Sequence, residues 1–129
     1  MPSDLPPWPA PPLSTTSREA ATRYRRGIAA LVAGIGFAHE LLAEAVADDP
    51  DFYLAWIGIA VAWAAAGRPY DAPRPRGRPL RGERQHAEIV EAALAGDRAH
   101  AADLRREHLL EYPGDLLIVW LPALAQPLR

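Results

Sequence analysis

The sequence predicts an all-α protein, and three observations lead to this fold class. Apolar residues recur at the spacing of a helix face over most of the chain. Glycine and proline interrupt this pattern at intervals that suit short helical hairpins. Strict alternation of apolar and polar residues, which is typical of a half-buried strand, does not occur. We therefore expect helices joined by tight turns.

Two helices are predicted at 17–34 and 37–47, and they form the first antiparallel pair. Serines and threonines at the start of the first helix offer N-caps, and apolar residues follow at helical spacing. Gly34 and Gly36 supply the turn between the helices. The second helix is apolar on one side and charged on the other, which is typical of an amphipathic surface helix.

The third helix is predicted at 52–66, and it carries no charged residue. It is shorter than the roughly 20 residues that a bilayer requires, so no membrane partner is expected. A helix that is apolar on every side is usually surrounded by protein. We therefore interpret this segment as the central buried helix.

An Arg/Pro linker is predicted at 68–81, because four prolines within it forbid a continuous helix. Five arginines and one aspartate also give this tract a local positive charge. Acidic residues of the same chain or of a second subunit are the simplest source of neutralisation. Aromatic residues are not interleaved as in nucleic-acid modules, so no nucleic-acid partner is expected.

The last pair of helices is predicted at 83–95 and 98–112, with Gly96 and Asp97 at the turn. An uncharged tail follows, and its proline interrupts or ends one more helix.

The two ends of the chain complete the domain organisation. Residues 1–14 contain six prolines and predict an extended arm, whereas 15–129 form a single helical domain. The chain has no cysteine, which excludes a disulfide framework, a thiolate metal site and a cysteine nucleophile. The start of the chain lacks the features of a signal peptide, so we expect a cytoplasmic protein.

Small residues and large wedging residues follow a regular order through the second and third predicted helices. They are Ala38, Leu42, Ala45 and Pro50, then Trp56, Ile59, Ala60, Trp63 and Gly67. This order resembles a tetratricopeptide repeat, in which antiparallel helix pairs stack on one another. The resemblance implies a short stack of such pairs, to which the proline-rich arm and the Arg/Pro linker are added.

Residues 37–120 also resemble, more narrowly, bacterial proteins similar to tetratricopeptide repeat protein 38. The shared features are a Pro-Asp-Phe start to an alanine-rich helix, a Glu-Arg-x-His stretch, an Ala-x-x-Gly-Asp turn and a tyrosine before Pro-x-Asp. Family members usually have a helix where this chain has the Arg/Pro linker. The resemblance implies a fold and little chemistry.

Repeats of this kind are binding scaffolds more often than catalysts, so we favour a non-catalytic module that binds a peptide or protein. The expected groove is lined by Tyr24, Tyr53, Trp56 and Trp63. An uncharged tail at the end of a repeat array would leave an uncapped edge, which predicts a homodimer. The interface would contain the central helix together with Leu116, Leu117, Trp120 and Leu121.

The last helical pair contains the residues that could carry other chemistry. His86 and His108 lie at mirrored distances from the turn, so we expect both at one end of the hairpin, with Glu83, Glu107 and Glu111 nearby. The favoured interpretation is structural and metal-free: a buried histidine bonded to a glutamate. The alternative is a small biosynthetic enzyme that folds a small-molecule substrate in an apolar pocket and uses His86, Glu83 or His108 for proton transfer. No motif indicates a cofactor.

Overall fold

The computed structural model describes residues 9–67 and 74–124, and within these ranges it contains six α-helices and no strand. The helices are α1 (Arg18–Ala33), α2 (Ala38–Asp48), α3 (Tyr53–Ala65), α4 (Arg81–Leu94), α5 (Arg98–Glu111) and α6 (Leu116–Leu124). The all-α prediction is confirmed, and the bounds lie close to those expected. Part of the predicted arm, part of the linker and the chain end fall outside the described residues.

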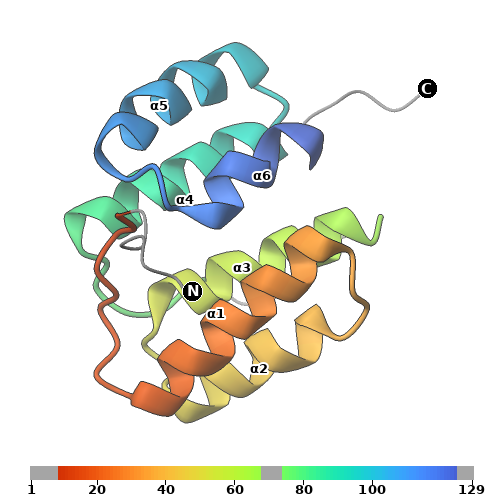
Figure 1. The fold of residues 1–129 in the computed structure, drawn as a ribbon, viewed down its shortest axis with the longest axis vertical. Coiled ribbons are helices and arrows are strands. Elements are labelled where there is room, and N and C mark those ends of the chain that lie inside the picture. Colours follow the sequence, from red (N-terminus) through yellow and green to blue (C-terminus); the bar gives the residue numbers. More distant parts are fainter. Residues whose placement is uncertain (1–8, 68–73, 125–129) are drawn as a thin grey trace, which may run out of the picture.

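The six helices form two layers (Figure 1). In the first layer α1 pairs with α2 and α3 packs against both, and in the second α4 pairs with α5. The layers meet where α3 contacts α4 and where α6 contacts α1. Antiparallel pairs therefore exist as expected, whereas their stacking in the manner of a tetratricopeptide repeat stays a prediction.

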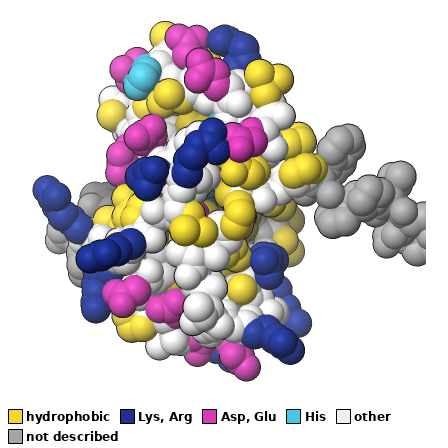
Figure 2. Space-filling view, turned by 90° about the vertical axis from the view of Figure 1, so that its left-hand side faces the viewer, with side chains coloured by type: hydrophobic (Ala, Val, Ile, Leu, Met, Phe, Trp, Pro, Cys, Tyr) yellow, Lys and Arg dark blue, Asp and Glu magenta, His cyan; other side chains and the backbone are white. Residues whose placement is uncertain are grey.

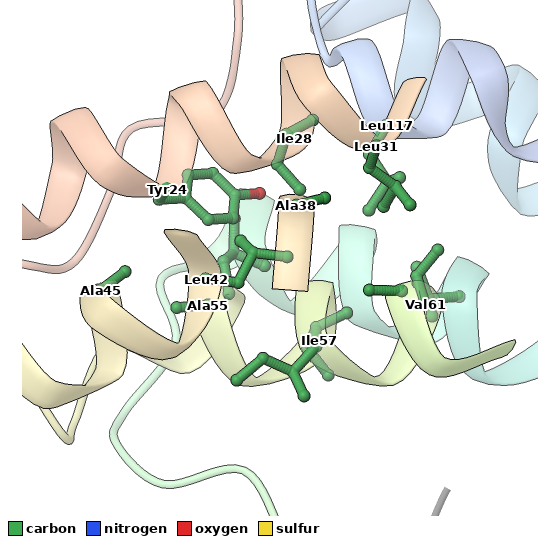
Figure 3. Close-up of a cluster of buried hydrophobic side chains, with 14 of the residues drawn as sticks. Tyr24, Ile28, Leu31, Ala38, Leu42, Ala45, Ala55, Ile57, Val61 and Leu117 are labelled. Carbon is green, nitrogen blue, oxygen red and sulfur yellow. The ribbon is translucent and has the colours of Figure 1, made fainter. Parts of the chain in front are cut away.

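The core between α1, α2 and α3 is built from apolar side chains of all three helices (Figure 3). Tyr24 and Ile28 project from α1, and Leu42 of α2 is fully buried beside them. Leu117 of α6 is also part of this cluster. Ser17 caps the start of α1: its hydroxyl accepts a hydrogen bond from the Ala20 amide at 3.0 Å, as the predicted N-cap requires.

The described part of the linker is not helical, which confirms the prediction for residues 74–80. Gly77 has a φ of 107°, and a Cβ placed there would lie 1.9 Å from the Asp51 carbonyl oxygen. The linker therefore crosses the α2–α3 turn in direct contact with its backbone. Arg76 forms an ion pair with Asp51 at 3.5 Å, so part of the linker charge is neutralised within the chain.

The last helix, α6, is not an open edge of the helical stack, because it packs against α1, α4 and α5. Leu117 and Leu121 are 1% and 2% exposed, so these two residues of the predicted dimer interface belong to the core of the protomer. Leu116 is exposed and Trp120 is half-buried, so they remain available to a partner. None of the described helices has the length and apolar character needed to cross a membrane.

Candidate functional site

A buried carboxylate joins the three helices of the second layer. Asp115, directly before α6, accepts a hydrogen bond from His86 Nδ1 of α4 at 2.9 Å. The same carboxylate oxygen accepts one from His108 Nε2 of α5 at 2.7 Å. All three side chains are buried. We call this group the His–Asp–His cluster.

The geometry of the α4–α5 hairpin explains where the two histidines of this cluster lie. The two histidines lie at the same end of the α4–α5 pair, as their mirrored spacing from the turn predicted. The expected glutamate partner is wrong, because the carboxylate comes from Asp115. A sequence signal existed: an aspartate follows Pro113 and Gly114 and precedes an uncharged helix, which is a typical helix-start position.

The two histidines favour the ionised form of the buried Asp115 carboxylate. Burial by itself raises the pKa of Asp115, but the charge of His86 and the hydrogen bonds from both histidines outweigh this effect and hold that pKa well below its usual range. Burial raises the pKa of Tyr24 well above its ordinary value, and the carboxylates of Asp115 and Glu83 raise it further. Asp115 is therefore a carboxylate, and the Tyr24 hydroxyl keeps its proton.

Glu83 is fully buried and ties the proline-rich arm to α4. One carboxylate oxygen accepts hydrogen bonds from the Ser14 amide at 3.0 Å and the Ser14 hydroxyl at 3.1 Å. The other accepts the Leu80 amide at 2.8 Å, which caps the start of α4. Glu83 therefore acts as a structural acceptor.

The described residues of the arm lie against the second layer. A Cβ at Gly82 would lie 2.9 Å from Pro11, so the missing side chain lets the arm approach α4. The Gly114 amide donates a hydrogen bond to the Pro9 carbonyl at 2.6 Å. Residues 9–14 are thus attached both to α4 and to the turn that carries Asp115.

A cavity of about 190 Å³ lies between the arm, α1 and the start of α6, and we call it the α1–α6 cavity. Its lining residues are Ala10, Pro11, Leu13, Tyr24, Arg25, Ile28, Leu54, Gly114, Asp115, Leu116 and Leu117. Most of them are apolar, and the polar groups come from Tyr24, Asp115 and Arg25. Asp115 of the His–Asp–His cluster is therefore one of the residues that line this cavity.

A second cavity, of about 420 Å³, lies between the α1–α2 turn and the end of α3, and we call it the α2–α3 groove. Trp63 lines it, and its ring lies 6.0 Å from that of His39. Ile35, also in the lining, and Phe37 in the same turn are 44% and 53% exposed. This groove therefore has exposed apolar residues at its edge.

The four aromatic residues of the predicted groove do not line one cavity. Tyr24 lines the α1–α6 cavity and packs on Phe52, with ring centroids 5.1 Å apart. Trp63 lines the α2–α3 groove. Trp56 donates its indole N–H to the Pro50 carbonyl at 2.8 Å, and Tyr53 is half-buried.

The residues predicted for proton transfer are all buried, and each has at least one hydrogen-bond partner. Nδ1 of His108 lies 2.9 Å from the Gln85 amide oxygen, so both ring nitrogens have neighbours. Nε2 of His86 is buried and has no hydrogen-bond partner among the described residues. In the described part of the chain, no group of three or more acidic or histidine side chains is arranged to hold a metal ion.

Comparisons with models of protein families, with curated proteins and with solved structures find no match to this chain.

Proposed function

We propose that the protein is a non-catalytic helical module that binds a peptide segment of a partner protein in the α2–α3 groove. The supporting observation is the exposure of Ile35 and Phe37 beside a groove that already contains Trp63. Adjacent exposed apolar residues at a concave surface are typical of an interaction site. Trp63, which lines this site, is one of the four aromatic residues expected in a groove from the sequence.

The α2–α3 groove has the chemistry of a peptide site. Its walls are mostly apolar, with the side chains of His39 and Glu40 as polar groups at the start of α2. Apolar side chains of a peptide would bury against Trp63, and the two polar groups would fix its orientation. A tetratricopeptide-like arrangement of helix pairs would suit such a scaffold, and it remains a proposal.

Peptide selection followed by mapping tests this function. Peptides selected from a random displayed library should shift the amide resonances of the α1–α2 turn and the end of α3. Phe37→Ser should weaken their binding at least about fivefold, since an aromatic anchor often contributes more than about 1 kcal/mol. Leu110→Ser is the matched control, because Leu110 is 83% exposed and lies on α5. Failure to select any peptide, or equal losses in both variants, would contradict the proposal.

A small helical enzyme remains the second candidate because of one feature of the His–Asp–His cluster. In its neutral form His86 would donate Nδ1–H to Asp115 and keep Nε2 without a partner among the described residues, which is the arrangement of an oriented general base. Its ring is 0% exposed, however, so a substrate could reach it only after the helices separate. The binding function requires no such change and is therefore favoured.

We also propose self-association through the outer side of α6. Leu116 and Val119 are 45% and 44% exposed on a helix without charged residues. A second copy would cover both by pairing the same surface about a two-fold axis.

A further inference from the structure

The α1–α6 cavity has at its edge a positively charged residue without an ion-pair partner among the described residues. Arg25 lines the cavity, is exposed, and forms no ion pair with any described residue. Arg23, two positions earlier on α1, is paired with Glu44 and Asp48. The guanidinium of Arg25 is therefore available to an anion from outside the described chain.

The negative group in the same cavity is already compensated. The Asp115 carboxylate accepts hydrogen bonds from both histidines. A cation in the cavity would compete with two buried imidazoles for this carboxylate, whereas an anion near Arg25 would find no competitor. The Arg25 end of the cavity therefore favours a negative ligand.

The size of the cavity limits the ligand. A volume of about 190 Å³ is below the roughly 300 Å³ at which sites for drug-sized molecules begin. It suits a short aliphatic chain against Ile28, Leu54 and Leu117, which are apolar and buried. A carboxylate at the end of that chain could form paired hydrogen bonds with Arg25.

We propose that the α1–α6 cavity is a binding site for a small aliphatic carboxylic acid of about six carbons, with Arg25 as the residue that selects the acid. The site is distinct from the α2–α3 groove. The protein would thus bind a small carboxylate in the α1–α6 cavity and a peptide in the α2–α3 groove.

Three probes of similar shape and different charge test the site. They are 4-methylpentanoate, 4-methylpentanamide and 3-methylbutylamine, each titrated into isotope-labelled protein. The acid should shift the amides of Gly114, Leu116 and Leu117 with a dissociation constant on the order of millimolar. It should bind about threefold to fivefold more tightly than the amide, because an exposed ion pair contributes modestly, and the difference should shrink in salt.

Two arginine variants provide the control. Arg25→Gln should abolish the preference for the acid over the amide, while Arg26→Gln should keep it, because Arg26 is exposed and does not line the cavity. N-acetylleucine distinguishes a free acid from the end of a peptide, and it should bind more weakly than 4-methylpentanoate.

Five outcomes would overturn the proposal, and the first four concern relative affinities. They are equal affinity for acid and amide, preference for the amine, equal losses in both arginine variants, and tighter binding of N-acetylleucine. The absence of any shift with all three probes would also overturn it. None of these results bears on peptide binding in the α2–α3 groove, so the two proposals fail independently.

Discussion

Asp115 links the three helices of the second layer. It is 6% exposed, and its carboxylate connects α4, α5 and the start of α6 through two histidines. A buried charge is costly without partners, so each member of the cluster requires the others. Such a cluster fixes the relative position of three helices at one point.

Asp115→Asn should lower the free energy of unfolding by about 3 to 5 kcal/mol near pH 7, because it breaks a buried ionic group. The pKa of Asp115 is lower in the folded state than its unfolded value of about 3.9. Its stabilising effect is therefore complete above about pH 4 and declines as the pH falls further. Urea unfolding followed by circular dichroism between pH 2.5 and 7, conditions chosen for the test, should show this decline in the unmodified protein and a weaker one in the variant. Parallel curves would contradict the assignment.

The linker and the arm add contacts between the two layers, beside the direct packing of α3 on α4 and of α6 on α1. The linker contacts the α2–α3 turn at Gly77, and the arm reaches α4 through Ser14 and Glu83. Neither segment is helical in its described part, so each contributes through a few specific contacts. Substitution at these contacts should therefore act on the interface between layers and leave the helices intact.

Gly77→Ala should destabilise the protein by more than about 2 kcal/mol, because it adds a Cβ at positive φ against a backbone atom. Gly34→Ala is the matched control: Gly34 has a φ of 76°, and a Cβ there meets nothing within 4 Å. The control should lose only the conformational cost, about 1 to 2 kcal/mol. Thermal and urea unfolding of both variants provide the measurement, and equal losses would refute the contact between Gly77 and Asp51.

At the scale of the whole molecule, α6 brings the two ends of the helical series together by contacting α1. In an open repeat array each unit contacts only its neighbours. Here Leu117 and Leu121 of α6 are buried, while Val119 faces outward. One helix therefore serves both the core and the surface proposed for self-association.

Val119→Asp should dissociate a dimer while changing the stability of the protomer by no more than about 0.5 kcal/mol. Leu117→Asp should instead unfold the protein, because it places a charge in the core. Sedimentation equilibrium at tens of micromolar, with circular dichroism as the folding control, distinguishes these effects. An unmodified protein that is monomeric under these conditions would contradict self-association.

The sequence by itself determined the helices, because helical spacing and glycine or proline punctuation are local properties. The pairing of His86 with His108 at one end of a hairpin was also predictable, since it follows from distances to a single turn. Asp115 was not predictable as their partner in the same way, because it lies beyond the hairpin in sequence. Its position depends on where α6 returns to the core.

Only the tertiary structure decided which apolar residues face outward. Leu116 and Leu117 are neighbours in an uncharged helix, yet one is exposed and the other is buried. A helix that is apolar on every side carries no signal for its orientation, so contacts with α1 and α4 set it. For the same reason the aromatic residues of α1 and α3 could be identified from the sequence, but their division between two cavities could not.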